Sequence, residues 1–204
     1  MSSNFHAKNC KCNSVDYFLS EVDSCEMEYK EKVETLESIE LLIVGNEPYP
    51  SGSNGIAFCN NSWNELMNGR CGGRYLLCSL GIDFSKIKSN YKSPVSLFMK
   101  MANKGIVCVN QNDELLSMCL EKKSKVSITC GSKISSVVVE NVKKSSERIV
   151  KIDRHPSPQG ESNPPDKQGT WYKYWGTFEN ILKILEPSGK GPIHDAINEI
   201  NSHS

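Results

Sequence analysis

The sequence predicts a three-layer α/β fold in which a central four-stranded, mainly parallel, twisted sheet is flanked by helices. Four short apolar runs alternate with stretches of helical character: LLIV at 41–44, GIVCVN at 105–110, KVSITCG at 125–131 and RIVKID at 148–153. Strands that alternate with helices are joined by right-handed crossovers into a parallel sheet. The runs also lack strict alternation of apolar and polar residues, which is typical of strands buried on both faces.

The helices are predicted from the stretches between these runs. The mixed-charge segment CEMEYKEKVETLESI, with apolar residues at helical spacing, predicts a helix over 25–39. The segment KSPVSLFMKMANK predicts a helix over 92–104, with Ser93 as its cap and Pro94 at its first position. The remaining helices are expected over 112–121 with Asp113 and Glu114 near its start, from beyond Gly131 through 144, and over 171–185 as a closing amphipathic helix that continues through Gly176.

Length and composition indicate one domain. We expect a single domain over 25–204, preceded by a polar, Ser- and Asn-rich flexible leader over 1–24. Lys and Arg number 24 and Asp and Glu number 24, which argues against nucleic-acid binding by bulk charge but leaves room for a local basic face. The sequence has no apolar run of membrane-spanning length and no signal-peptide core.

The nine cysteines are an odd number and are scattered along the chain. Several fall inside apolar runs, which is typical of buried, reduced thiols in a cytosolic or nuclear protein. A metal site near the N-terminus would have to use His6, Cys10, Cys12 and Cys25, whose spacing matches no zinc pattern. We therefore expect no metal site and no cofactor.

The loops that follow the predicted strands are dense in polar residues, Gly and Pro. They read GNEPYPSGSNGIAF at 45–58, NQNDE at 110–114, GSK at 131–133 and RHPSPQG at 154–160. In a parallel sheet, ligands bind at the carboxyl ends of the strands. These loops are therefore the candidate functional site.

Four residues in these loops have both a functional and a plain structural interpretation. His155 is held in a stiff loop by neighbouring prolines, and the alternative is a surface histidine in a tight turn. Asn110 can donate to and accept from the edge of a heterocyclic base, and the alternative is a helix cap. Phe58 could stack on a planar ligand or pack in the core. Tyr49 could line a pocket or lie half-buried in a turn.

Taken together, the loops carry a family pattern. The chain resembles the uracil-DNA glycosylases, most closely family 1, which has a GQDPYH motif, a strand that ends in Asn, and an HPSP loop. The corresponding segments here are GNEPYP at 45–50, GIAF at 55–58, GIVCVN at 105–110, HPSP at 155–158, and the closing segment WGTFENILKILEPSGKGPIHDAI at 175–197. The motifs occur in the family's order, each in its expected strand or loop context.

The resemblance implies a DNA-repair hydrolase: a monofunctional glycosidase of base excision repair that removes uracil and leaves an abasic site. The enzyme would flip the damaged nucleotide out of the stack into a pocket and hydrolyse its N-glycosidic bond. Among the matching positions, Glu47 would orient the attacking water, and His155 would donate a hydrogen bond to the uracil oxygen that gains charge. These two residues are the implied catalytic residues.

The resemblance also implies which residues hold the substrate. Phe58 would stack on the flipped base, and Asn110 would match the hydrogen-bonding edge of uracil. Tyr49 would exclude the methyl group of thymine. Asn46 would offer a backbone N–H and a side-chain amide to the base. The residues expected to contact DNA are Pro50, Ser157, Pro158 and Gln159.

The chain departs from the family pattern at four of these positions. Glu47 stands where the family has aspartate, so the same carboxylate is carried on a stem one methylene longer, and small displacements of a catalytic group reduce rates. Asn46 replaces a glutamine, and Pro50 replaces a histidine. Gln159 stands where the family usually has a leucine that wedges into the DNA stack.

The middle of the chain matches the family poorly. Between the first motif and the Asn-ended strand it reads RCGGRYLLCSLGIDFSKIKSNYKSPVSLF, at 70–98. Candidate phosphate contacts in this region compete with an interpretation as solvated surface charge. They are Arg70, Arg74, Lys86 and Lys88.

These departures leave two other functions open. One is a catalytically weakened DNA-binding relative that acts as a replication or processivity subunit, and the other is a glycosylase for a different damaged base. The expected partners are uracil-containing DNA, single- or double-stranded, and a protein such as a uracil-mimicking inhibitor or a replication factor. We expect a monomer without membrane association, located inside the cell wherever its DNA lies: the bacterial cytoplasm, the nucleus or a viral replication site.

Overall fold

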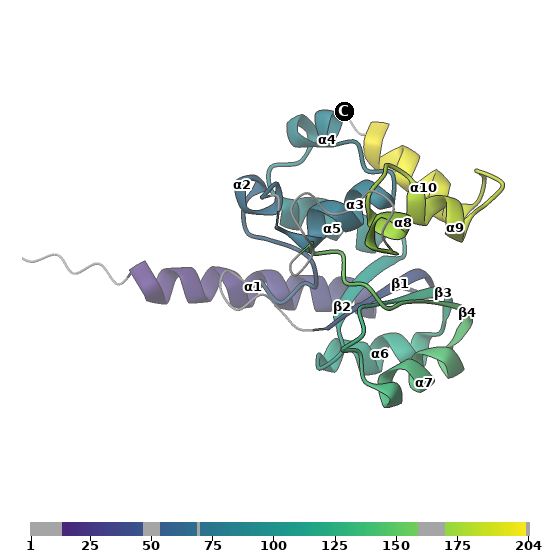
Figure 1. Ribbon diagram of the computed structural model, residues 1–204. Helices are drawn as coiled ribbons and strands as arrows, with labels where there is room; N and C mark the ends of the chain where they lie inside the picture. The colour runs from purple at the N-terminus through teal and green to yellow at the C-terminus, as the bar shows by residue number, and fades with distance from the viewer. Residues whose placement is uncertain (1–13, 47–53, 69, 159–169, 203–204) are drawn as a thin grey trace, which may run out of the picture.

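The computed structural model describes residues 14–46, 54–68, 70–158 and 170–202. Its centre is a four-stranded sheet in the spatial order β2-β1-β3-β4 (Figure 1). All strand pairs in this sheet are parallel. The strands are β1 (Ile39–Gly45), β2 (Ile106–Asn110), β3 (Ser124–Cys130) and β4 (Ser146–Ile152). Each lies within two residues of its predicted position, and the predicted three-layer α/β fold is confirmed.

The crossovers place helices on both faces of the sheet. α5 (Pro94–Asn103) lies on the connection from β1 to β2, whereas α6 (Glu114–Lys122) and α7 (Ser136–Ser145) follow β2 and β3 across the sheet in the opposite direction. Right-handed crossovers that run in opposite directions lie on opposite faces. Figure 1 accordingly shows α6 and α7 below the sheet and α5 above it.

Several helices that the sequence did not predict gather on the α5 side (Figure 1). They are α2 (Trp63–Leu66), α3 (Gly72–Ser79), α4 (Phe84–Asn90) and α10 (Pro192–Ser202). The predicted start of α5 is confirmed, because Ser93 Oγ accepts a hydrogen bond from Ser96 N–H at 3.3 Å and Pro94 begins the helix. No helix in the described part of the chain is both long enough and apolar enough to cross a membrane.

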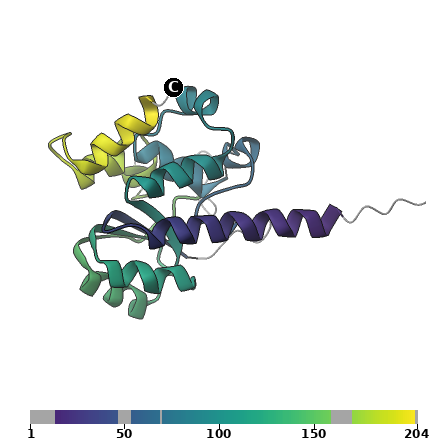
Figure 2. The ribbon, with the colours of Figure 1, turned by 180° about the vertical axis from the view of Figure 1, so that it is seen from behind.

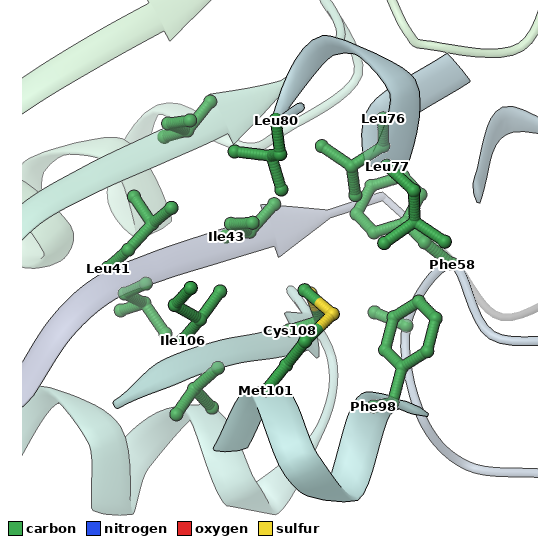
Figure 3. Packing of buried hydrophobic residues seen from close by; sticks show 14 of the residues in the cluster. Leu41, Ile43, Phe58, Leu76, Leu77, Leu80, Phe98, Met101, Ile106 and Cys108 are labelled. Atoms are coloured by element: carbon green, nitrogen blue, oxygen red, sulfur yellow. The ribbon is translucent and has the colours of Figure 1, made fainter. Parts of the chain in front are cut away.

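β1 forms the centre of the hydrophobic core. Its segment 41–44 is 0% exposed throughout, because β1 has a strand on either side and helices on both faces. Figure 3 shows Leu80, Met101 and Cys108, from the end of α3, from α5 and from β2, gathered near Ile43. Complete burial of one such aliphatic side chain contributes about 1.5–3 kcal/mol. This packing fixes the strand ends on which the candidate site is built.

The N-terminal helix differs from its prediction at both ends. The helix expected over 25–39 is α1 (Ser14–Glu34), so residues 14–24, expected in the flexible leader, are helical. Their polar composition obscured a helical period, although the apolar positions Val15, Phe18 and Val22 keep the three- and four-residue spacing. The helix ends early because the apolar segment that follows enters the sheet as β1. Residues 1–13 of the expected leader lie outside the described residues.

Two contacts fasten α1 to the rest of the molecule. Tyr29 is 2% exposed, and its hydroxyl donates to Cys108 O at 3.3 Å and accepts from Cys108 N–H at 2.9 Å. β2 pairs only with β1, so this hydroxyl occupies backbone groups on the outer edge of the sheet. Lys122 Nζ donates to the carbonyls of Glu34 and Leu36, both at 2.9 Å, at the end of α1. Figure 2 shows α1 crossing the body and projecting beyond it.

The prediction of one continuous closing helix over 171–185 is wrong. The segment forms two helices, α8 (Thr170–Trp175) and α9 (Asn180–Leu185), with Gly176 at the break. A Cβ at Gly176 would lie 2.2 Å from Tyr172 Cδ1, so only glycine fits where the chain turns back over its own helix. Asn180 Nδ2 donates to Lys173 O at 3.0 Å, which satisfies a carbonyl at the end of α8.

Candidate active site

The carboxyl ends of the four strands meet at one edge of the sheet. Gly45 of β1 is the register partner of Asn110 of β2, and Cys130 of β3 is the partner of Ile152 of β4. β1 and β3 are neighbours whose following connections leave toward opposite faces. Such a switch point is where open α/β sheets bind their ligands. The four candidate loops therefore start from one place in the fold.

Asn110 is buried at this edge without serving as a helix cap. The residue is 5% exposed, and the cap of α6 is Asp113, whose carboxylate accepts from Leu115 N–H at 2.9 Å. Within the described ranges, no hydrogen bond involves the Asn110 carboxamide. A Cβ at Gly45 would lie 3.3 Å from Asn110 Oδ1, so the absence of a side chain at Gly45 makes room for this amide. A buried amide of this kind is available to a ligand.

Phe58 lies against the end of β1 in an uncommon backbone conformation. Its φ of 64° is left-handed, which is unfavourable for a bulky residue, and such strain gathers at functional sites. A Cβ at Gly45 would lie 3.0 Å from Phe58 Cζ, so the ring is in contact with the strand end. A Cβ at Gly73 would lie 2.0 Å from Phe58 O, so the start of α3 also needs a glycine. Phe58 is 6% exposed and belongs to the core as well, as Figure 3 shows.

His155 faces Phe58 across the strand ends. The two ring centroids lie 5.6 Å apart, with the ring planes inclined by 33°. His155 Nδ1 accepts a hydrogen bond from Ser157 N–H at 3.0 Å. Burial, followed by the positive charge of Lys133, lowers the pKa of His155. The ring is therefore favoured as a neutral imidazole, and with Nδ1 accepting, its proton is on Nε2, where it can be donated to a ligand.

Two tryptophans hold the loop that carries His155. Trp175 Nε1 donates to Arg154 O at 2.9 Å, and Trp171 Nε1 donates to Pro156 O at 3.3 Å. Both tryptophans are nearly fully buried, so their hydrogen bonds hold the carbonyls on either side of His155 against the core. The HPSP loop is thus held by these two hydrogen bonds as well as by its prolines. Both tryptophans follow the loop later in the sequence.

Three of the residues expected to contact DNA, Ser157, Arg74 and Lys86, have partners within the protein. Ser157 Oγ donates to Arg70 O at 2.9 Å, and Pro158 beside it is half-buried. Arg74 Nη1 donates to Met67 O at 3.0 Å, and Lys86 Nζ on α4 lies 3.6 Å from the carboxylate of Asp83, which caps that helix. A hydroxyl that donates can still accept, but these contacts do not by themselves indicate a phosphate site.

Gln111 is a site residue that the sequence did not single out. Its Nε2 donates to Asn46 Oδ1 at 2.7 Å and to Lys133 O at 3.2 Å, and its Oε1 accepts from Ser135 N–H at 2.8 Å. Its backbone N–H donates to Gly45 O at 2.9 Å. The only signal in the sequence was its position directly after Asn110, in a loop at the same sheet edge.

The glycine pair at the start of α3 is a second feature that was not predicted. A Cβ at Gly72 would lie 3.0 Å from Ser157 N and 3.1 Å from His155 Cε1, and Gly73 makes room for Phe58 O. The two glycines let the Phe58 loop and the His155 loop approach the same helix end. They fall in the middle segment that matches the uracil-DNA glycosylase pattern poorly, so no motif marks them in the sequence.

Four of the predicted site residues lie outside the described residues: Glu47, Tyr49, Pro50 and Gln159. Those that are described lie at the end of a strand, as Asn110 does in β2, or in the loops that follow the strand ends: Asn46, Phe58, Asn110, His155, Ser157 and Pro158. Among the described side chains, no group of three or more His, Cys, Asp or Glu is arranged to hold a metal ion. A surface pocket beside α5, lined by residues such as Tyr91 and Met99, contains none of the candidate residues.

Comparison with models of known protein families found no family that matches the chain, and comparison with curated proteins found no similar protein. A function for the chain therefore has to be inferred from the geometry of the site. That geometry joins an aromatic ring, a buried amide with no hydrogen-bond partner among the described residues, and a neutral histidine that can donate a hydrogen bond. These are the groups needed to hold a planar heterocycle by its face and its polar edge.

Proposed function

We propose that the chain is a uracil-DNA glycosylase that hydrolyses the N-glycosidic bond of uracil in DNA. The observation that carries this proposal is the convergence of Phe58, Asn110 and His155 at the strand ends, with His155 Nδ1 occupied by Ser157 N–H at 3.0 Å. A neutral histidine with its proton on Nε2 can stabilise an oxygen that gains negative charge, without itself having to lose a charge.

The proposed reaction proceeds in an order set by these groups. DNA delivers a flipped nucleotide, and its base stacks on Phe58, which contributes about 1–3 kcal/mol for any base. Asn110 selects uracil, since its amide can face one donor and one acceptor, whereas cytosine presents the opposite pattern. The proposed role of Tyr49 is to exclude thymine by crowding its methyl group.

Cleavage transfers the glycosidic electron pair to uracil, which leaves as an anion. His155 Nε2–H donates to the uracil oxygen on which this charge gathers. The oxygen of a water held by Glu47 forms the new bond to the sugar carbon, and the proton released from that water passes to the carboxylate and then to solvent. The carboxylate also offsets the positive charge that builds on the sugar ring.

The test is cleavage of an oligonucleotide that contains a single uracil, followed by alkali, which breaks the strand at abasic sites. The parent chain should cut the uracil strand and leave a thymine strand intact. His155→Ala should reduce the rate by about 10²–10³-fold, because one preorganised donor is lost. His194→Ala is the matched control, since His194 lies on α10, away from the strand ends, and should leave the rate unchanged.

Substitutions at Glu47 separate the proposal from its alternative. Loss of cleavage in Glu47→Gln supports a glutamate-dependent hydrolysis. A parent chain that cuts nothing, together with activity in Glu47→Asp, would sink the enzyme proposal and favour the DNA-binding subunit. An active chain would work wherever uracil-containing DNA lies, which is the location we propose for it.

A further inference from the structure

Gln111 joins several loops at the strand ends and has no part in the reaction above. Its carboxamide bonds to Asn46 of the loop after β1 and to Lys133 and Ser135 of the loop after β3. Both N–H groups and one lone pair of the oxygen are used, so the amide has a defined orientation. A surface glutamine without a structural task would keep these groups in water.

We propose that Gln111 is a positioning residue of the glycosylase reaction. It fixes Asn46, which directly precedes Glu47 in the sequence, relative to the loop after β3 that carries Lys133 and Ser135. This inference rests on the proposed function. Gln111 does not touch the base or the sugar in this scheme. It acts through Asn46 on one side and through Lys133 and Ser135 on the other.

The geometry on the Asn46 side explains why the orientation matters. Gln111 Nε2 donates to Asn46 Oδ1, so the Nδ2 end of the Asn46 amide faces away from Gln111. Asn46 is therefore presented as a hydrogen-bond donor, with its direction chosen by Gln111. The residue that follows Asn46 in the sequence is Glu47, so in the proposed scheme the position of Asn46 helps to set where the Glu47 carboxylate would hold the water.

The other side of the network leads to His155. Gln111 Nε2 holds the carbonyl of Lys133, and Gln111 Oε1 holds the amide of Ser135 at the cap of α7. Lys133 is the residue whose positive charge acts on the His155 ring. Because the Gln111 backbone is itself tied to Gly45 O at 2.9 Å, one residue sets the spacing between the two halves of the site.

The test compares Gln111→Glu with the parent. Glutamate has the same shape but cannot donate, so it loses the bonds to Asn46 Oδ1 and Lys133 O. We expect kcat on the single-uracil oligonucleotide to fall by about tenfold to a hundredfold, because displacement of a catalytic group by about 1 Å has that effect. KM should stay within about threefold, since Phe58 and Asn110 still bind the base. Asn141→Asp adds the same charge on exposed α7 and should change neither constant.

A double-mutant cycle with Asn46→Ala tests the route of the effect. If Gln111 acts through Asn46, Gln111→Glu should lower kcat by less than about threefold once Asn46 is already alanine. Effects that multiply in full, or a parent-like kcat in Gln111→Glu, would overturn the inference while leaving the proposed function intact. A rise in KM with unchanged kcat would also overturn it, because it would make Gln111 a binding residue.

A measurement that needs no activity keeps the two proposals separate. Hydrogen exchange of the Ser135 amide should speed up by about tenfold or more in Gln111→Ala, which removes its acceptor, and should be unchanged in Asn141→Asp. Unchanged Ser135 exchange in Gln111→Ala overturns the loop connection. A parent chain that releases no uracil, with Ser135 still protected by Gln111, overturns the proposed function and the catalytic role, but not the connection between the loops.

Discussion

The Phe58 ring and the His155 imidazole lie with their centroids 5.6 Å apart at an angle of 33°, although one follows β1 and the other follows β4. Each residue reaches this position only because the neighbouring backbone leaves room for its ring. Phe58 needs a left-handed backbone and a glycine at 45, and His155 needs a glycine at 72 beside its Cε1. The candidate pocket is therefore defined as much by missing side chains as by the rings themselves.

Gly45→Ala should damage the site directly. The new Cβ would lie 3.0 Å from Phe58 Cζ and 3.3 Å from Asn110 Oδ1, so both groups must move. Overpacking of this kind destabilises by about 1–3 kcal/mol. We expect the free energy of unfolding, measured by denaturant titration, to fall by the same amount. Binding of free uracil should weaken at least tenfold, which corresponds to about the energy of one lost polar contact.

Gly189→Ala is the control for that change. Gly189 has φ 66° and open space around its Cα, so alanine there costs about 1 kcal/mol of backbone strain without touching the site. Its uracil binding should equal that of the parent. Equal losses of uracil binding in both variants would mean that the Gly45 effect comes from general destabilisation.

Asn110→Leu should separate stability from ligand binding. Asn110 is 5% exposed, and its carboxamide has no hydrogen-bond partner among the described residues, so replacement by an apolar side chain of similar volume should keep or raise the melting temperature. The same change should weaken uracil binding by about tenfold to a hundredfold, since bonds to a buried polar edge are lost. A lower melting temperature with unaltered uracil affinity would show that Asn110 is structural.

The stability of the folded chain should depend on pH through His155. Its pKa is lowered in the folded state by burial and by Lys133, whereas in the unfolded chain it returns to about 6.5. The unfolded state therefore binds this proton first, so the contribution of His155 is complete above about pH 6.5 and is lost as the pH falls through the folded-state value. Denaturant titrations at about pH 7 and about pH 5 should show a smaller loss of stability in His155→Asn than in the parent. An identical loss in His155→Asn and in the parent would contradict the prediction.

Tyr29→Phe should loosen α1 from the sheet. The hydroxyl makes hydrogen bonds to both backbone groups of Cys108, and their removal leaves buried groups unpaired, at about 1–3 kcal/mol each. We expect a fall in melting temperature and faster exchange of the Cys108 amide. Tyr172→Phe removes a hydroxyl that bonds to no described residue, and it should have little effect. Equal melting temperatures for the two variants would argue against the role of Tyr29.

Local sequence patterns were sufficient to predict the strands. They failed for features of the fold that depend on contacts between residues distant in the sequence. The strands were found because each is an apolar run covered on both faces, and α5 because Ser93 and Pro94 mark its start. The break at Gly176 was missed because the helical spacing on either side continues through it, and only the position of Tyr172 shows that the chain folds back. The helical residues 14–24 were missed because polar composition outweighed a correct helical period.

The candidate site shows the same division. His155, Asn110 and Phe58 could be placed at the strand ends, because they stand in short motifs that follow predicted strands. Gln111 and the glycines at 72 and 73 could not, because their importance depends on loops that meet only in space. A lone glutamine in a polar loop has no local pattern that distinguishes it from surface.

The contact between Tyr29 and Cys108 also bears on how the protein can associate. A partner peptide can extend a sheet only where a strand offers unpaired backbone groups. At β2, Tyr29 occupies those of Cys108, and at β4 the exposed charges of Glu147, Arg148 and Lys151 disfavour a flat apolar neighbour. Strand addition by a partner peptide is therefore disfavoured at Cys108 on one edge of the sheet and along the charged residues of β4 on the other.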